Sequence, residues 1–246
     1  MRYWTRHGKL AMMGKNGSLS DSELYFYKNK SNIISFDINL KFKENTTYSY
    51  ISEKDFLSIP KNNISSKYSL IQTISKIDDT FLSVKGSTLR EFRETKNKYD
   101  KLVTIKKSPN STTEILELIE LWDRTSGIKY GWQKHSGYDR SFFVSHYENE
   151  KDKLQGLFFY INDKLVGYSI ISLEKEDEVY VYMLRKNDTS YRNLCLYIDF
   201  ISFETLYRGS PIFINWGASS GGVLKYKEKF PTASQEKLYF FKLNTN

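Results

Sequence analysis

Residues 156–184 read GLFFYINDKLVGYSIISLEKEDEVYVYML, and this stretch decides the fold. It contains three apolar runs rich in β-branched and aromatic residues, at 156–161, 165–173 and 179–184. A polar Asn-Asp-Lys turn separates the first two runs, and an acidic turn separates the second from the third. Short runs bounded by turn residues are typical of strands joined by hairpins. The stretch therefore predicts three consecutive antiparallel strands.

Helix and strand patterns alternate on both sides of these strands. Upstream, residues 112–122 carry apolar side chains at positions i, i+3, i+4 and i+7, which predicts a helix with one buried face. Downstream we expect a helix at about 194–207, a strand at 211–215, a short lysine-rich helix and a last strand at 238–242. This order predicts an α+β domain with a mixed central sheet flanked by helices.

The N-terminal part is rich in strand patterns. Apolar and aromatic runs at 24–27, 33–38 and 47–51 are separated by polar turns and read as strands of a meander. Ser52, with Asp55 three residues later, predicts the start of a short helix. This part of the chain is mixed and smaller than the domain that follows.

A charged segment at 87–98 opens the second part of the chain, and its spacing predicts a helix. We place the boundary just before it, so that residues 1–84 form a strand-rich subdomain and residues 85–246 form the main domain. The exposed face of this helix is either solvated surface or one wall of an anionic groove. The groove would be lined by Arg90, Arg93 and Lys96, together with Trp132 from an aromatic loop at 127–138.

The segment after the strand 211–215 has the residue types of a ligand-binding turn. Glycines let the backbone approach a ligand closely, and a helix N-terminus offers unpaired N–H groups to an anion. A glycine-rich turn at 216–222 leads here into a short basic helix. We expect the substrate- or cofactor-binding residues of this segment to be Asn215, Gly217, Gly221, Gly222, Lys225 and Tyr226.

Two segments resemble a known family. Asn215-x-Gly217, followed by GGVLKYKEKFP at 221–231, resembles the closing segment of the FemABX-like and phosphatidylglycerol lysyltransferase C-terminal (DUF2156-like) families of the GNAT superfamily. Residues 85–99 resemble the basic helix that opens the GNAT-like unit of the lysyltransferase family, and Trp122 is in the expected place. The resemblance covers roughly residues 80–242, and it implies that residues 1–84 are a truncated second GNAT-like unit.

The resemblance implies an acyl- or aminoacyltransferase that moves an activated group to an amine or hydroxyl acceptor. By resemblance, Lys227 is the best candidate for a phosphate or oxyanion contact, since an ammonium can neutralise charge that grows in the transition state. The carboxylates that are candidates for the general base are Asp199, Glu204 and Glu178, and we select Asp199. A substrate amine that loses its proton to water would need no base.

The loop at 185–193 differs from the typical GNAT phosphate loop because it contains no glycine. This difference argues against a standard acetyl-CoA site, and FemABX-like relatives that share it use aminoacyl-tRNA as donor. Arg185 and Arg192 can still pair with phosphates through their side chains, and we include Tyr182 among the binding residues. We expect no tightly bound cofactor, aminoacyl-tRNA or acyl-CoA as donor, and a reaction between the 182–192 and 215–227 segments.

The net charge of +8 and the pI near 9.2 raise the expectation of an anionic partner, such as tRNA, CoA or another nucleic acid. Two rival interpretations therefore stay open. The first is a protein that binds or modifies nucleic acid on a GNAT-like scaffold, and the second is a GNAT-like binding module without catalysis. The sequence leaves the oligomeric state open.

Several function classes lack their residues in this sequence. One cysteine, Cys195, excludes an internal disulfide, and three separated histidines show no ligand spacing, so we expect no metal. No nucleophilic Ser-His-Asp set, P-loop or dinucleotide fingerprint is visible. No apolar run approaches about 20 residues and no signal-peptide pattern is present, so we expect a cytoplasmic protein without a transmembrane segment.

Overall fold

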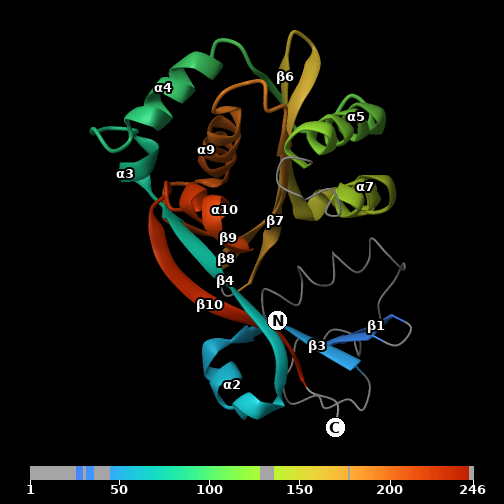
Figure 1. Cartoon of the computed structure of the whole chain (residues 1–246). Coiled ribbons are helices and arrows are strands. Elements are labelled where there is room, and N and C mark those ends of the chain that lie inside the picture. The colour runs from blue at the N-terminus through green and yellow to red at the C-terminus, as the bar shows by residue number, and fades with distance from the viewer. Residues whose placement is uncertain (1–25, 30–31, 36–44, 128–135, 177, 244–246) are drawn as a thin grey trace. The chain divides into compact units, whose positions relative to one another are not determined.

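The computed structural model describes residues 26–29, 32–35, 45–127, 136–176 and 178–243 (Figure 1). The chain divides into two compact units, and the two points of division fall within strands β4 (Ile64–Ile77) and β9 (Ile212–Ser219). We call residues Lys76–Ile214 the central unit, and Met1–Ser75 with Asn215–Asn246 the terminal unit. Each unit is described by itself.

The central unit contains the three strands predicted from residues 156–184. They are β6 (Leu154–Ile161), β7 (Lys164–Glu176) and β8 (Val179–Asn187), and each pairs antiparallel with the next. A short strand, β5 (Thr104–Lys106), pairs antiparallel with the other edge of β6. The turn between β6 and β7 has positive φ at both Asn162 and Asp163, as a two-residue hairpin turn requires. The predicted meander is confirmed.

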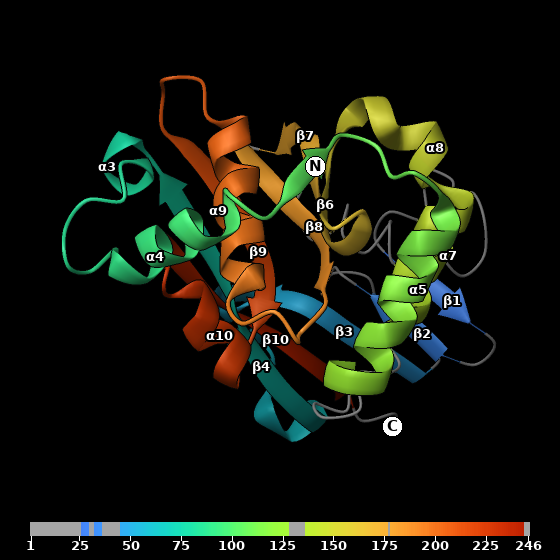
Figure 2. The same ribbon diagram turned by 90° about the horizontal axis from the view of Figure 1, so that it is seen from above.

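Helices pack on both faces of this four-stranded part of the sheet (Figure 2). On β7, Ser169 contacts a helix on one face, and its neighbour Tyr168 contacts a helix on the other. The first face carries α9 and α4, and the second carries α5 and α7. The helices of the unit are α3 (Asp79–Leu82), α4 (Arg90–Tyr99), α5 (Thr112–Trp122), a π-helical turn η3 (Asp123–Gly127), α7 (Ser136–Ser145), α8 (Tyr147–Glu150), the 3-10 turn η5 (Lys151–Lys153) and α9 (Leu194–Leu206).

Local sequence explains the predicted helix at 112–122. The side chain of Ser111 accepts a hydrogen bond from the backbone N–H of Glu114, and the Glu114 carboxylate accepts one from the backbone N–H of Ser111, which completes a capping box. Ile115, Leu118 and Ile119 form the buried face of α5. Helix α9 is different, because its buried residues lie on all sides, as expected of a helix inside a core.

Two aromatic clusters fill the space beside the sheet in the central unit. One lies under α7 and α8 and consists of Phe142, Phe143, Tyr147, Phe158 and Tyr168. The other joins α3, α4 and α9 through Phe81, Phe92 and Phe200. None of the described helices of the chain is long and apolar enough to cross a bilayer.

A bulge interrupts the pairing of β7 with β8. Ile170 opposes Leu184 but Ile171 opposes Tyr182, so Met183 is left without a partner in the ladder. An extra residue in one strand shifts the side-chain alternation by one position. Tyr182 and Arg185, three residues apart, therefore point to the same face of the sheet, where α9 lies.

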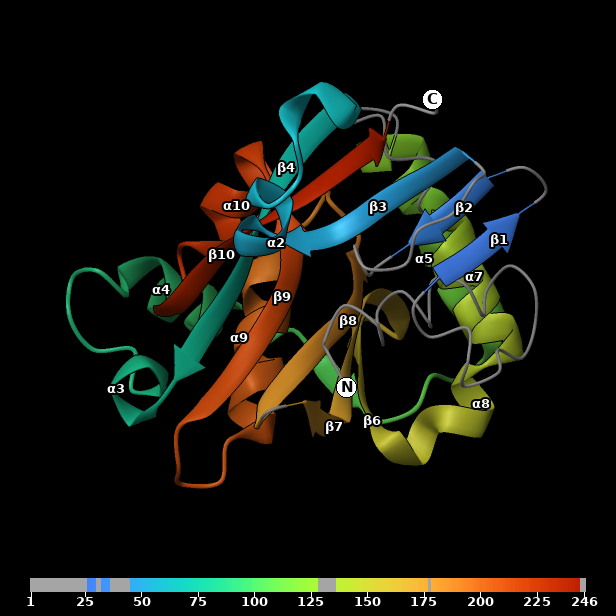
Figure 3. The ribbon, with the colours of Figure 1, turned by 90° about the horizontal axis from the view of Figure 1, so that it is seen from below.

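The terminal unit is built on strands from both ends of the chain (Figure 3). The strand order is β1-β2-β3-β10-β4, so the C-terminal strand lies between two N-terminal strands. The strands are β1 (Phe26–Asn29), β2 (Asn32–Ser35), β3 (Asn45–Ser52), β4 (Ile64–Ile77), β9 (Ile212–Ser219) and β10 (Thr232–Leu243), and the helical segments are α2 (Glu53–Leu57), η2 (Lys61–Asn63) and α10 (Gly221–Lys227).

One expectation for this unit differs from the structure. The first three strands are not a simple meander, because β2 and β3 are parallel. The C-terminal residues 215–246 belong to the same unit as residues 1–75, because β10 pairs antiparallel with both β3 and β4. These hydrogen bonds join segments that are far apart in the sequence. The domain boundary expected at residue 84 stays a prediction, since a compact unit need not be a separate domain.

The core of the terminal unit is small and aromatic. Its buried members are Tyr48, Ile51, Phe56, Tyr239 and Phe241. Phe56 of α2 stacks on Tyr239 of β10 with ring centroids 4.0 Å apart. The predicted cap of α2 is confirmed, because Ser52 accepts a hydrogen bond from the backbone N–H of Asp55.

The close packing of β7 against α9 generates a prediction. A Cβ atom added at Gly167 would overlap Cδ1 of Ile198 and lie 3.4 Å from the carbonyl oxygen of Lys186. We expect Gly167→Ala to lower the free energy of unfolding by about 1–3 kcal/mol, measured by urea denaturation. Ile198→Val removes the overlapping atom, so the double variant should recover most of that loss. A double variant that shows the sum of the two single losses would contradict this packing.

Candidate functional site

A buried ionic cluster in the central unit joins β8 to α9. Arg185 donates a hydrogen bond of 2.6 Å to one carboxylate oxygen of Asp199, and Tyr182 donates one to the other oxygen. Asp199 has no exposed surface, whereas the Arg185 side chain is 27% exposed. A buried carboxylate requires such partners, because an unpaired charge in a core is strongly destabilising. Three residues expected in the site are thus brought together.

This cluster has a definite electrostatic character. Burial, together with the negative charge of Asp199, raises the pKa of Tyr182 well above its ordinary value of 10. Tyr182 therefore stays a neutral phenol at physiological pH and acts as a hydrogen-bond donor. Next to it, the hydroxyls of Ser169 and Ser202 lie 2.5 Å apart. The arrangement orients the guanidinium of Arg185 rigidly, with Asp199 as its counter-ion.

Several backbone N–H groups of the loop between β8 and α9 donate hydrogen bonds to acceptors within the protein. The N–H of Asp188 donates to the carbonyl oxygen of Val166 at 2.8 Å, and the N–H of Ser190 donates to the Asp188 carboxylate at 3.0 Å. The N–H of Tyr191 donates to the carbonyl oxygen of Asp188. A loop that holds a pyrophosphate needs such N–H groups for the ligand and no carboxylate among them. The expectation that a standard CoA site is absent stays a prediction.

In the terminal unit, Lys227 is buried and bonded to the main chain. Its Nζ atom donates hydrogen bonds of 2.8 Å to the carbonyl oxygens of Trp216 and Gly217, and the residue is 6% exposed. Gly217 has a φ of 73°, a conformation that favours glycine. The ammonium therefore holds this part of β9 in place. Its expected role at an oxyanion stays a prediction.

The glycine-rich turn expected at 216–222 is mostly strand and helix. Strand β9 continues to Ser219, and α10 begins two residues later at Gly221, which has a φ of 54°. Asn215 accepts a hydrogen bond of 2.9 Å from the N–H of Gly217, so its side chain also stabilises this part of the strand. The remaining expected residues lie on α10, with Gly222 and Lys225 exposed and Tyr226 packed beside Trp216.

The cations expected in an anionic groove have partners inside the protein. Arg90 pairs with Glu94 at 2.6 Å, and Lys96 lies 3.3 Å from Asp100. Arg93 donates to the carbonyl oxygens of Val84 and Gly86, so it stabilises the chain before α4. Arg192 is exposed, and its carbonyl oxygen accepts a hydrogen bond of 2.7 Å from Tyr99. Trp132 lies outside the described residues.

A second buried cluster, which was not predicted from the sequence, lies on the opposite face of β7 and β8. Asp139 of α7 lies 3.0 Å from Nζ of Lys186 and accepts a hydrogen bond of 2.7 Å from Tyr168. The same Nζ atom lies 4.4 Å from the centroid of the Trp122 ring. Burial and the charge of Asp139 raise the pKa of Tyr168 well above 10. Lys186 directly follows Arg185 on β8, and successive side chains of a strand point to opposite faces of the sheet. The sequence therefore offered a signal for a charged residue on this second face.

The expected site residues are divided between the two units. Tyr182, Arg185, Arg192 and Asp199 belong to the central unit, and the residues from Asn215 onward belong to the terminal unit. A reaction between the 182–192 and 215–227 segments thus stays a prediction. Within the described part of the chain, no group of three or more His, Cys, Asp or Glu side chains could hold a metal ion.

Comparisons with known proteins identify the fold. No protein-family model and no curated protein matches the sequence. The L-PGS structure from Bacillus licheniformis matches 97% of this chain and 91% of its own, with a TM-score of 0.55 and 14% identity. The C-terminal DUF2156 domain of a putative lysylphosphatidylglycerol synthetase from Agrobacterium fabrum matches 98% of this chain and 87% of its own, with a TM-score of 0.57 and 12% identity.

A third similar structure is a conserved protein of unknown function from Bacteroides thetaiotaomicron. It matches 82% of this chain and 71% of its own, with a TM-score of 0.60 and 18% identity. The expected α+β, GNAT-like fold of the DUF2156 type is confirmed by these likenesses. At these identities they establish the fold alone.

The raised pKa of Tyr182 predicts a loss of stability at high pH. The unfolded chain releases this proton near pH 10, whereas the folded chain retains it to higher pH. The stability from this group is therefore complete below pH 10 and is lost as the pH rises towards the folded-state pKa, by up to about 1.4 kcal/mol per pH unit. Urea denaturation at pH 8 and pH 11 should show a smaller decline for Tyr182→Phe than for the wild type. Equal declines would contradict the assignment.

The burial of Lys227 generates a second prediction. Lys227→Met leaves the carbonyl oxygens of Trp216 and Gly217 without their donor, and we expect the free energy of unfolding to fall by about 2–4 kcal/mol. Lys225→Met, on the same helix but exposed, is the matched control and should change it by less than about 0.5 kcal/mol. Similar urea midpoints for the two variants would show that the two hydrogen bonds contribute nothing.

Proposed function

We propose that this protein is an acyltransferase that moves an aminoacyl group from aminoacyl-tRNA to an amine or hydroxyl acceptor. The observation that carries the proposal is the fold likeness over almost the whole chain to L-PGS and to the domain of a lysylphosphatidylglycerol synthetase. A likeness of this length extends to both units, so it includes the segments that hold Arg185 and Lys227. The names of those two proteins supply the reaction class.

The loop 188–193 favours tRNA over acyl-CoA as the donor. Its backbone N–H groups at Ser190 and Tyr191 donate within the loop, and it carries the carboxylate of Asp188. A pyrophosphate held there would meet the Asp188 carboxylate, which lies 3.7 Å from Nζ of Lys164, and would find the N–H groups of Ser190 and Tyr191 already bonded. The phosphates of an aminoacyl-tRNA lie along an extended backbone. Such a donor therefore needs no loop of N–H groups around a single pyrophosphate.

The proposed reaction is a single acyl transfer. The acceptor nitrogen or oxygen forms a bond to the ester carbonyl carbon, the bond from that carbon to the terminal ribose oxygen breaks, and the acceptor proton passes to the ribose oxygen. Negative charge grows on the carbonyl oxygen as the acceptor attacks. We assign the neutralisation of this charge to the guanidinium of Arg185, with Asp199 and Tyr182 as positioning residues.

Asp199 suits the positioning role better than the expected role of general base. Both of its carboxylate oxygens accept hydrogen bonds, and the residue is completely buried, so an acceptor cannot reach it without breaking the cluster. Lys227 likewise bonds two backbone carbonyl oxygens, which favours a positioning role. A substrate amine would then lose its proton to water, and water would supply the proton that the leaving ribose oxygen takes up.

The test determines from which donor the protein transfers an acyl group. Purified protein is incubated with radiolabelled aminoacyl-tRNAs or with acetyl-CoA, together with amine and hydroxyl acceptors, and the transfer of label is measured. We expect transfer from aminoacyl-tRNA, reduced roughly tenfold or more by Arg185→Lys, which keeps a charge beside Asp199 but removes the planar fork. Arg124→Lys is the control, since Arg124 is exposed on the π-helical turn η3 and pairs with Glu120.

The outcomes separate the alternatives. Transfer from acetyl-CoA alone would overturn the proposed donor, but the proposed acyl transfer would still hold. Salt-sensitive binding of tRNA without any transfer would overturn the enzyme and favour a nucleic-acid-binding protein. Equal activity of the Arg185→Lys and Arg124→Lys variants would remove Arg185 from the reaction.

A further inference from the structure

A hollow of about 460 Å³ lies beside α5 and the start of β7 in the central unit. Its lining includes three leucines and three carboxylates: Leu118, Leu121, Leu165, Glu114, Glu117 and Asp163. Leu118 and Leu165 are buried and form an apolar floor, whereas Glu117 and Asp163 are exposed at the rim. We call this site the acidic hollow. It suits a partner that carries both aliphatic and basic side chains.

The negative charge of the acidic hollow is available to a partner. Within the described ranges of the chain, the carboxylates of Glu117 and Asp163 have neither an ion pair nor a hydrogen-bond donor. Glu114 is engaged, since it accepts a hydrogen bond of 2.6 Å from the N–H of Asn110. Lys164 also lines the hollow, but its Nζ atom lies 3.7 Å from a carboxylate outside the hollow, and its charge is offset there.

The segment after α4 has the complementary composition. Residues 101–107, which we call the basic segment, read KLVTIKK and include β5, the edge strand of the sheet. Leu102 is 51% exposed and Ile105 is 38% exposed. Lys101 and Lys107 are exposed as well, and neither has an ion pair within the described residues. Exposed lysines thus flank two exposed aliphatic side chains.

Contacts within the unit fix the basic segment beside the acidic hollow. Thr104 of β5 opposes Tyr160 of β6, and the Tyr160 hydroxyl donates a hydrogen bond to Glu114 at the hollow. Lys106 of β5 donates a hydrogen bond of 2.8 Å to the side chain of Asn110, whose N–H in turn donates to Glu114. These bonds make the two surfaces rigid neighbours.

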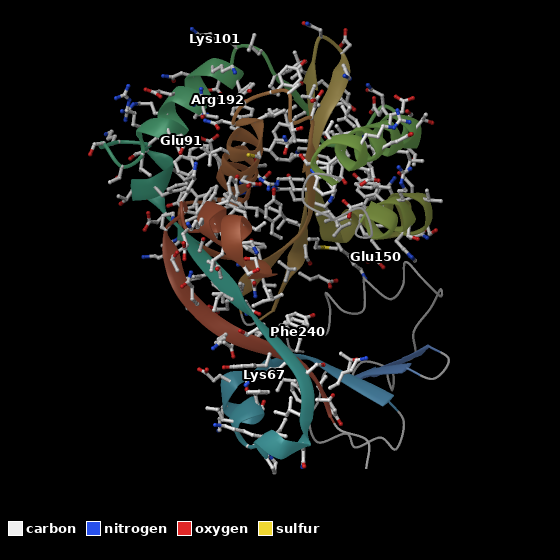
Figure 4. All side chains as sticks on the ribbon, viewed as in Figure 1. Lys67, Glu91, Lys101, Glu150, Arg192 and Phe240 are labelled. Carbon is white, nitrogen blue, oxygen red and sulfur yellow. The ribbon has the colours of Figure 1, made fainter. Side chains whose placement is uncertain are left out.

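Both surfaces lie at one end of the central unit. Figure 4 shows Lys101 and Arg192 there, beside the end of α4, and the turn between β6 and β7 reaches the same end. A surface with two complementary parts side by side can pair with its own copy, because a two-fold axis brings each part of one molecule against the other part of the second. Each complementary contact is then made twice.

We propose that the protein forms a two-fold symmetric homodimer in which the basic segment of each copy docks into the acidic hollow of the other. The lysines of one copy neutralise the rim carboxylates of the second. Leu102 covers the leucine floor, so apolar surface of both copies leaves water. The inference concerns assembly and stands independently of the proposed transfer reaction.

Charge and composition favour a second copy over other occupants of the hollow. A small organic cation would neutralise the rim but leave Leu102 and Ile105 in water. A partner that covers both surfaces at once must carry a basic aliphatic segment next to an acidic hollow, and this chain carries both. With a net charge of +8, two copies repel each other unless surfaces of opposite sign meet, and this pair of surfaces supplies that match.

The test is sedimentation equilibrium of the whole protein over a wide range of concentrations, in which we expect a wild-type dimer. Lys101→Glu sets like charges against the rim, and Glu117→Lys sets like charges against the basic segment. Each should raise the dissociation constant of the dimer roughly 30-fold or more, since two attractive contacts become repulsive. The charge-matched controls are Lys85→Glu, before α4, and Asp152→Lys, on η5, which should leave it nearly unchanged.

Mixing the two test variants gives the sharpest result. An equimolar mixture of Lys101→Glu and Glu117→Lys should form a heterodimer about as tight as the wild type, because both of its contacts again join opposite charges. The double variant should recover its own dimer for the same reason. Recovery in the mixture would also show that both single variants are folded. Leu102→Ser should weaken the wild-type dimer, and this loss should persist at high salt.

Three results would overturn the proposal: a wild-type monomer at every concentration, equal losses in test and control variants, or a mixture that stays monomeric. A monomer whose acidic hollow binds a lysine-rich peptide would overturn the second copy as its occupant. A dimer without aminoacyl transfer would refute only the proposed function, and transfer by a monomer only this inference.

Discussion

A carboxylate without contact to water determines the geometry of the central unit. Asp199 lies in the middle of a helix whose other buried positions are almost all apolar, so the surrounding strands must supply its hydrogen-bond donors. The bulge at Met183 meets this need, because it turns Tyr182 and Arg185 to the same side of β8. Helix α9, strand β8 and the loop that joins them are thereby fixed in one arrangement, and the candidate site inherits that rigidity.

Other buried charged side chains lie at or next to the residues that were expected to form the site. Lys227 holds the backbone of β9, and Lys186 holds Asp139 on the far face of β8 from Asp199. Each of these ions has partners, as a low-dielectric interior requires. Such networks restrict side chains to one geometry at a cost in stability, which is the arrangement that a preorganised site uses. The exposed arginine and lysines at the end of α4 are the opposite case, because their charge remains available to a partner outside the protein.

Local patterns predicted the strands of residues 154–187 and helix α5 well, because alternating or helical spacing and the capping box at Ser111 act within a few residues. Pairings over long distances in the sequence left no such pattern. The parallel pairing of β2 with β3 and the place of β10 depend on hydrogen bonds between remote segments. In the site, residue types indicated Asp199 and Arg185, and the family resemblance indicated Lys227. The carbonyl partners of Lys227 and the bulge at Met183 had no local signal.

The position of β10 has a consequence for synthesis on the ribosome. Ser65, at the start of β4, donates its hydroxyl to the carbonyl oxygen of Lys242, 177 residues later in the chain. At about 5–20 residues per second, β3 and β4 wait roughly 10–30 s for the strand that separates them. The central unit, whose antiparallel strands are consecutive in the chain, can condense during that time. Until β10 emerges, two strand edges are open to mispairing with other nascent chains, which makes the terminal unit the part of the protein that most needs a chaperone.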